Sequence, residues 1–227
     1  MIREFFTSRH GGVSAGQYSN FNLALHVGDE VASVLENRQI LAKALGLTVD
    51  RVFYMDQVHG NEIAVIERSR PFSQNPKVDA LITKESGTAL VVLVADCIPL
   101  LFRSPSAIAA VHVGRAGLVS GIVEEIIAKL NLFGAKNNEI RAAIGPAICG
   151  NCYEVSTEIY LDVVAKYPAT ATTLEKHRLD LPAGVISILD SFEIEYSREN
   201  SCTSHGENFF SYRRDGVTGR QAGVIAW

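Results

Sequence analysis

The residues from Val91 to Gly117 constrain the fold of this chain more than any other part of its sequence. Two apolar runs, Ala89–Ala95 and Ala107–Val113, lie on either side of the turn-forming sequence FRSPS. Apolar runs of this length, with polar, proline or glycine residues at their ends, are typical of buried β-strands. We therefore expect a pair of buried strands in the middle of the core.

Each of these runs carries or precedes a reactive side chain, Cys97 after the first run and His112 within the second. If the two strands pair, the thiol and the imidazole meet at one end of a sheet. With the carboxylate of Asp96 beside them, they suit either a metal site or a Cys–His nucleophile pair. The alternative is a core cysteine and a hydrogen-bonded strand-end histidine, because single residues of these types are often buried without a chemical role.

Length and charge exclude several classes of protein. The 227 residues are compatible with one domain over residues 1–227, and a hydrophobic content of 47% supports a large core without disulfides. The formal charge of −4, with no longer basic run than Arg213–Arg214, argues against nucleic acid as a partner.

Two charged residues near the start, Arg3 and Glu4, occupy the place where a signal peptide has its apolar core. No stretch approaches the roughly 18 apolar residues of a membrane-spanning helix. We expect a cytoplasmic protein with no membrane partner, a monomer or small homo-oligomer, whose cysteines stay reduced.

A Cys-x-x-Cys pair is formed by Cys149 and Cys152. A structural zinc ion would need two further ligands from a second knuckle. Only Cys202 and scattered histidines are left to supply them. We therefore expect this pair to pack within the fold rather than to bind metal or undergo redox chemistry.

Periodicity and turn signals predict the remaining elements. We expect a helix capped by Asp29 and ending at Gly46, two short strands in VFYMDQVHGNEIAVIE, a strand at Ala80–Thr83, a helix from near Ser120 to Gly134, a strand at Ile140–Ile144, helices at Thr157–Tyr167 and Pro182–Leu189, and two strand-like runs around the Asp215-Gly216 turn. The absence of regular strand–helix alternation in the first hundred residues argues against a doubly wound nucleotide-binding fold.

Polar segments between these elements hold further candidate residues. The loop SRHGGVSAGQYSNFNLA contains Arg9, His10 and Asn22, and His59 lies in the polar break between two short strands. A polar loop is either an ordinary surface segment or a functional one. The glycine-containing turn HVGRAG leads from a strand toward a helix, an arrangement that suits an anion.

Eight short motifs, spread in order over nearly the whole chain, resemble those of one known family. They are SRHGGVS, NRQILAKALGL, QVHG, DALIT, ADCIPLL, VHVGRAG, IGPAICGNCYEV and FFSYRRDGVTGR. The chain resembles the family once called multicopper polyphenol oxidase, or laccase domain, whose members are now described as purine nucleoside phosphorylases or peptidoglycan editing factors. The resemblance implies an α/β (α+β) fold with a two-sheet core and flanking helices, related to bacterial toxin cysteine hydrolases.

The resemblance also implies a metal site made by His59, Cys97 and His112. Three protein ligands leave the fourth position of a tetrahedral zinc ion open, as in catalytic sites, and copper is the alternative metal. The implied activity is phosphorolysis of adenosine or inosine, extending to methylthioadenosine, with adenosine deamination as a side activity. Purine nucleoside and phosphate are then the partners, and Asp96, Cys97 and His112 are the candidate catalytic residues.

Candidate substrate-binding residues are Arg9, Asn22, Arg38, Gln57 and Arg115. Arg38 falls on or beside the buried face of its predicted helix, which indicates an inward-facing role, and the arginines of the last motif are further candidates for binding phosphate. One motif departs from the family pattern, since His112 begins HVGRAG where the family usually has His-Ala-Gly-Trp-Arg-Gly. The role of that Trp–Arg pair therefore does not carry over.

Other functions stay open. Cys97 and His112 could act as nucleophile and base of a hydrolase that edits a peptidoglycan precursor. A non-enzymatic domain with a structural zinc ion would need a fourth protein ligand. Copper-dependent phenol oxidation is disfavoured because it requires several copper ions and more histidines than the six present.

Overall fold

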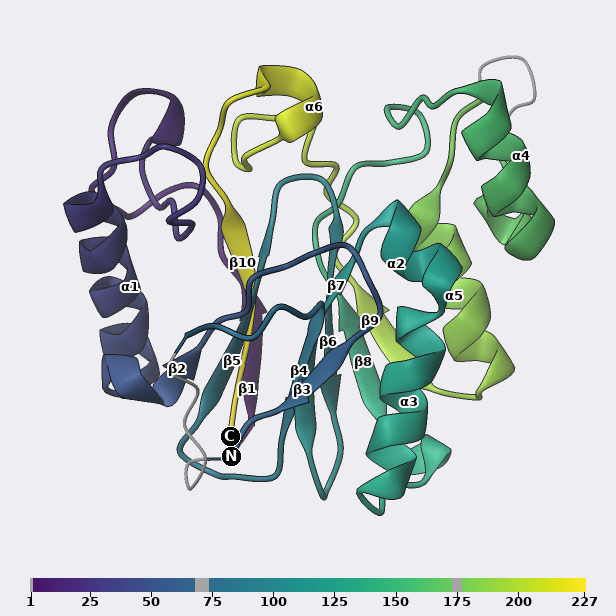
Figure 1. Cartoon of the computed structure of the whole chain (residues 1–227), viewed down its shortest axis with the longest axis horizontal. Coiled ribbons are helices and arrows are strands. Elements are labelled where there is room, and N and C mark those ends of the chain that lie inside the picture. The colour runs from purple at the N-terminus through teal and green to yellow at the C-terminus, as the bar shows by residue number, and fades with distance from the viewer. Residues whose placement is uncertain (1, 68–73, 173–176) are drawn as a thin grey trace.

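Two stacked β-sheets form the centre of the computed structural model, which describes residues 2–67, 74–172 and 177–227 (Figure 1). Sheet A has the order β1-β10-β5-β2, with β1 (Arg3–Phe6), β10 (Gln221–Ala226), β5 (Ala89–Val94) and β2 (Val52–Phe53). Sheet B has the order β3-β4-β7-β6-β8-β9, with β3 (Ile63–Val65), β4 (Ala80–Thr83), β7 (Ile108–Val113), β6 (Ile98–Arg103), β8 (Arg141–Ile144) and β9 (Glu195–Arg198). The two-sheet α/β fold expected from the sequence is confirmed.

The layering follows from apolar side chains on both faces of the central strands. Along β5, Leu90, Val92 and Val94 pack between the sheets, while Val91 and Leu93 pack on the other face, toward α1. Strands covered on both faces read as unbroken apolar runs rather than as alternating patterns. This is why the central strands are so conspicuous in the sequence.

Helix α1 (Val31–Leu45) covers the outer face of sheet A (Figure 1). It ends at Gly46, whose φ of 69° lies in the left-handed region that favours glycine, as expected for a helix C-terminus. The prediction that Asp29 is the N-cap of this helix is wrong, because the N-cap residue is Glu30. The Asp29 carboxylate instead accepts a hydrogen bond from the Asn22 side chain.

Three helices cover the outer face of sheet B (Figure 1): α2 (Arg115–Ser120), α3 (Ile122–Leu132) and α5 (Leu181–Ser191). Helix α4 (Thr157–Lys166) packs against α2, farther from the sheet. The helix expected from near Ser120 to Gly134 is confirmed as α3. The short helix before it, α2, was not expected, and Gly121, with a φ of 89°, separates the two. Within the described part of the chain, no helix is both long and apolar enough to cross a membrane.

The two apolar runs that flank FRSPS do not pair with each other. β5 belongs to sheet A and β7 to sheet B, and the sequence IPLLFR forms a separate strand, β6, that pairs with β7. Pro99 lies opposite His112 in this antiparallel hairpin. The thiol of Cys97 and the imidazole of His112 therefore meet at the open end of the β6–β7 hairpin, not through pairing of β5 with β7.

The prediction of two strands around the Asp215-Gly216 turn is wrong for the first of them. Residues before the turn form a short helix, α6 (Tyr212–Asp215), because the Ser211 hydroxyl accepts the backbone N–H of Arg214 and starts a helical turn. Only the run after the turn is a strand, β10, and it lies in the middle of sheet A. The short strands β1 and β9 were not expected, and both are largely exposed sheet edges with weak apolar patterning.

Candidate active site

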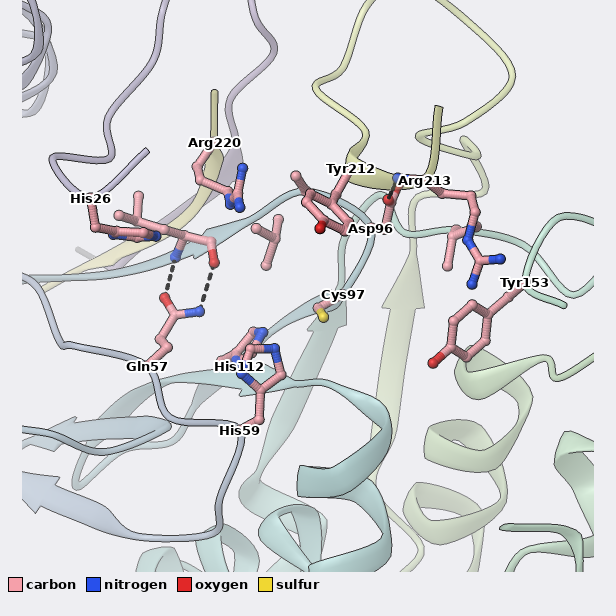
Figure 2. A pocket seen from close by; sticks show the side chains of 14 residues that line it. His26, Gln57, His59, Asp96, Cys97, His112, Tyr153, Tyr212, Arg213 and Arg220 are labelled. Carbon is pink, nitrogen blue, oxygen red and sulfur yellow. Dashed lines mark hydrogen bonds between the residues drawn. The ribbon is translucent and has the colours of Figure 1, made fainter. Parts of the chain in front are cut away.

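A pocket of about 350 Å³ lies where the ends of β5, β6 and β7 meet the segment around α6 (Figure 2). His59, Cys97 and His112 lie together in its centre, and their possible ligand atoms are all within 4.8 Å of one another. His112 is buried, Cys97 is partly exposed and His59 is exposed. Two imidazole nitrogens and a thiolate sulfur are a ligand set that suits zinc, so the residues present fit the metal that the resemblance implies.

The carboxylate of Asp79 holds two of these three side chains in place. It is fully buried and accepts the backbone N–H groups of Val58, His59 and Gly60 at 3.2, 2.9 and 2.7 Å. It also bonds the Nδ1 atom of His112 at 2.8 Å. Because Nδ1 is occupied, Nε2 is the nitrogen of His112 left free to face the thiol or a metal ion.

The charges of this group shift each other's pKa values. Burial raises the pKa of the Cys97 thiol, but the charge and hydrogen bonds of His112 and His59 outweigh it and bring the pKa down to about 6. Burial lowers the pKa of His112, but the Cys97 thiolate and the Asp79 carboxylate raise it to about 9. Without a metal, Cys97 and His112 thus form a thiolate–imidazolium pair near pH 7.

Two residues of the site other than glycine have left-handed backbones: His59 has a φ of 62° and Asp96 a φ of 93°. Such conformations cost on the order of 1–3 kcal/mol and persist only where surrounding contacts impose them. The Asp79 carboxylate does so at His59. At Asp96, the side chain accepts hydrogen bonds from the Thr203 hydroxyl at 2.6 Å and the Arg213 backbone N–H at 2.7 Å.

The turn HVGRAG approaches the ligand group through Gly114. A Cβ atom added there would lie 3.0 Å from Cδ2 of His59 and 3.3 Å from the Cys97 sulfur. Any side chain at this position would therefore press against His59 and Cys97, which would have to shift by a few tenths of an ångström. The anion site expected at this turn stays a prediction, and the helix that follows it, α2, has only six residues.

Of the expected substrate-binding residues, Gln57 lines the pocket, where its amide exchanges two hydrogen bonds with the backbone of Leu93, at 2.8 and 2.9 Å. Among the residues that the structure describes, the pocket wall does not include Arg9, Asn22, Arg38 or Arg115. Arg38 is half-buried, as its helix position predicts, and its guanidinium lies 3.8 Å from the centre of the Tyr54 ring. Arg9 stacks in the same way over Phe210.

Asn22 and Arg115 lie behind the pocket wall. Asn22 is buried, and its side-chain oxygen accepts the backbone N–H of Arg220 at 2.9 Å. Arg115 interacts with Tyr153, whose pKa is raised by burial and lowered in part by the guanidinium charge. Both residues therefore contact pocket-lining residues rather than the cavity itself.

The pocket has two chemically different ends. Figure 2 shows His26 and Arg220 on one side of the ligand group, and Tyr153 with Arg213 on the other. The Arg213 guanidinium lies 5.3 Å from the centre of the Tyr153 ring. Burial, and then the charge of Arg220, lower the pKa of His26, so its imidazole is largely neutral at pH 7.

Sequence reasoning missed Asp79, His26 and Tyr153 as site residues. The sequence could have indicated Asp79, because it comes directly before a fully buried strand and a buried carboxylate needs a hydrogen-bond partner. His26 has no such signal, because only the folding of its loop brings it to Arg220. The pocket-lining residues Tyr212, Arg213 and Arg220 belong to the last motif, which the sequence does single out.

A family model described as multi-copper polyphenol oxidoreductase laccase matches residues 3–227. A protein of Corynebacterium glutamicum named purine nucleoside phosphorylase is 44% identical, with 99% of this chain and 94% of that protein covered. A Streptomyces coelicolor protein of the same name is 42% identical, with 97% and 93% covered.

Solved structures agree with the fold. A protein of Neisseria meningitidis superposes with a TM-score of 0.88 at 32% identity, over 99% of this chain and 93% of that one. The protein YlmD of Geobacillus stearothermophilus superposes with a TM-score of 0.90 at 31% identity, over 99% and 91%. The likeness extends over essentially the full length in both comparisons.

Proposed function

The chain belongs to the multi-copper polyphenol oxidoreductase laccase family, and on that premise we propose that it is a purine nucleoside phosphorylase acting on adenosine and inosine. The observation that carries the proposal is a pocket in which the His/Cys/His group lies between His26 with Arg220 on one side and Tyr153 with Arg213 on the other. Nucleosides and phosphate are cytoplasmic metabolites, so we place the activity there.

The reaction requires an anion site next to the sugar. A phosphate oxygen forms a bond to C1′ of the ribose, the C1′–N9 bond breaks, and its electron pair leaves with the purine. We assign the phosphate to Arg220, because a guanidinium presents paired N–H groups to an oxyanion and remains charged at all relevant pH values. His26, which is largely neutral in the free protein, would gain a proton when the dianion binds beside it.

The purine belongs at the other end of the pocket. Tyr153 offers an aromatic face, and the guanidinium of Arg213 already stacks over that ring. Aromatic and guanidinium planes are good partners for a flat heterocycle. The developing negative charge on the departing base would then lie near Arg213.

The proposed metal ligands are His59, Cys97 and His112, with zinc as the expected ion and copper as the alternative. When bound, such an ion supplies a Lewis acid in the centre of the pocket. Asp79 orients His112 for this role. Asp96, the third candidate catalytic residue, has both carboxylate oxygens engaged by Thr203 and Arg213, which favours a role in positioning Arg213 over acid–base chemistry.

The proposal is tested by incubating zinc-loaded protein with inosine or adenosine, with and without phosphate. We expect free base and ribose 1-phosphate only when phosphate is present. Replacing Arg220 by Met should raise the KM for phosphate, whereas Arg51→Met, at a partly exposed arginine that is paired with Asp50 and does not line the pocket, should not. Conversion of adenosine to inosine without phosphate dependence would instead identify a deaminase, which attacks the ring with an activated water.

A second candidate function is favoured by one observation. The Asp79 carboxylate bonds His112, and His112 in turn bonds the thiol of Cys97, as in a Cys–His–Asp hydrolase. The pKa of this thiol is about 6. This arrangement suits nucleophilic attack by Cys97 on a carbonyl, as in the editing of a peptidoglycan precursor. A covalent adduct on Cys97, found by mass spectrometry in metal-free protein given peptidoglycan precursors, would support it.

A further inference from the structure

A second group of metal-ligand side chains lies outside the pocket's His/Cys/His group. Cys149-x-x-Cys152 and Cys202-x-x-His205 each form a tight turn, with the Cys152 N–H donating to the Cys149 carbonyl at 2.9 Å and the His205 N–H to the Cys202 carbonyl at 3.3 Å. The sequence contains no second Cys-x-x-Cys, and the second knuckle is instead the Cys-x-x-His at Cys202 and His205.

Backbone contacts hold the two turns together. Cys202 forms a parallel β-bridge with Ala147, and the Thr203 N–H donates to the Ala147 carbonyl at 3.2 Å. The Cys149 N–H points to the sulfur of Cys202 at 3.3 Å. The fold therefore brings together two knuckles that lie some fifty residues apart in sequence before any ion binds.

The four ligand atoms have the spacing of a single tetrahedral ion. All lie within 4.8 Å of one another, and Nε2 of His205 is 2.9 Å from the Cys152 sulfur and 4.0 Å from the Cys149 sulfur. Tetrahedral zinc, with bonds of about 2.3 Å to sulfur and 2.0 Å to nitrogen, separates its ligand atoms by about 3.5–3.8 Å. The observed separations bracket this range, and all three cysteines are free thiols.

We propose that Cys149, Cys152, Cys202 and His205 form a structural zinc site, separate from the ligand group in the pocket. Three thiolates and one imidazole complete a tetrahedral shell with protein atoms alone, which is characteristic of structural rather than catalytic zinc. Thiolate ligands select zinc over the oxygen-preferring cations magnesium and calcium.

The position of these four side chains indicates what a bound ion would stabilise. Ile148 and Tyr153, on either side of the Cys149–Cys152 turn, line the pocket, and Thr203 from the other turn donates its hydroxyl to Asp96. An ion bound by both turns therefore fixes the pocket wall that carries Tyr153. This would make it a support for the substrate site, without contact to the reacting atoms.

The test is zinc content by mass spectrometry on the full chain, purified without nickel and carrying Cys97→Ala, so that the pocket group lacks its thiolate. We expect about one zinc per chain, lost when Cys202→Ala is added. The matched control, Ser204→Ala in the same turn, should keep it. Absence of zinc from the Cys97→Ala protein, or its retention with Cys202→Ala, would overturn the proposal.

A second measurement covers the case in which Cys202→Ala does not fold. In the otherwise unaltered Cys97→Ala protein, zinc should protect Cys149 and Cys202 from iodoacetamide, and a chelator should expose both together. Added cobalt should give the visible spectrum of a tetrahedral thiolate site and be displaced by zinc. Equal alkylation rates with and without chelator, or a Cys149–Cys152 disulfide in the freshly purified protein, would contradict the site.

Discussion

The two ligand groups of this chain share one pocket wall but differ in what completes them. The pocket group has three side chains, one of them buried, and a buried carboxylate orders it from behind. The group at Cys149 and Cys202 has four side chains, none fully buried, and no carboxylate among its hydrogen-bond partners in the described residues. Three protein ligands, one of them a histidine held in place by a carboxylate, leave one coordination position of a bound metal ion open for substrate. Four protein ligands fill all positions of a tetrahedral ion.

We therefore expect the pocket group to take part in the reaction and the group at Cys149 and Cys202 to stabilise the pocket wall. Changes in the pocket group should abolish turnover while the protein remains folded. Changes in the closed group should mainly affect how well substrate binds and how firmly the wall is held. The following predictions, from the largest effect to the smallest, can contradict or refine this division.

Replacing His112 by Ala should have the largest effect. We expect phosphorolysis to fall by about 10³-fold, comparable to the loss of a main electrostatic contribution to catalysis. One equivalent of zinc should be lost, because the proposed metal site then lacks one of its two ligand nitrogens. Steady-state kinetics together with metal analysis measure both, and near-normal activity in a metal-deficient variant would remove the pocket group from the mechanism.

Asp79→Asn should have the next largest effect. The amide cannot replace the negative charge beside His112 and has only one oxygen for the N–H groups of the His59 turn. Loss of such an orienting carboxylate typically costs about 10–100-fold in metal affinity or activity. Zinc titration should show weaker binding, with activity partly restored by excess zinc. Unchanged zinc affinity would mean that Asp79 serves the fold alone.

The pH dependence of thiol reactivity should distinguish the two groups in metal-free protein. Cys97 has a lowered pKa, so its thiolate forms as the pH rises through about 6 and is lost below that value. Burial and the neighbouring Cys149 and Cys202 raise the pKa of Cys152 to about 11, so it stays protonated at neutral pH. Alkylation followed by mass spectrometry at each cysteine should therefore give widely separated midpoints.

His112→Ala provides the control for that experiment. Without the imidazolium, the midpoint for Cys97 should move up toward the value near 9 of an ordinary thiol, while Cys152 should not change. A Cys97 midpoint that stays near 6 would show that His112 is not the main source of the shift.

Cys202→Ala should have the smallest effect on catalysis. We expect the KM for nucleoside to rise by about fivefold with kcat nearly unchanged, the pattern of weakened substrate binding. The reason is that Tyr153 and Asp96 lose a constraint but keep their own contacts. Ser204→Ala should behave like the parent protein, and a kcat loss as large as that of His112→Ala would erase the distinction between the groups.

The sequence reveals the central strands because they are encoded locally, and its short motifs single out the three side chains at the centre of the pocket, His59, Cys97 and His112. Ala80–Thr83 is a strand as predicted, since four consecutive buried side chains leave a clear pattern. Gln57 and Cys97 both line the pocket, and the roles expected for them stay predictions. These successes depend on neighbours in sequence.

What the sequence does not reveal depends on contacts between distant segments. The Cys-x-x-His knuckle at Cys202 has meaning only next to Cys149, and the two are joined by a bridge that no periodicity predicts. Arg38, a reasonable candidate on its helix, is held by Tyr54 instead of facing the cavity. Likewise, nothing near His26 in the sequence indicates that it will meet Arg220.

The central place of β10 in sheet A affects how this protein can be made. β10 lies between β1 and β5, although it follows every other strand in chain order. During synthesis, β1 therefore has no strand to pair with until residue 226 has left the ribosome. Until then the edge of β5 that pairs with β10 also stays exposed. Arg220 and α6 emerge at the same late stage, so a nascent chain completes sheet A and gains the arginine that we propose to bind phosphate at the same time.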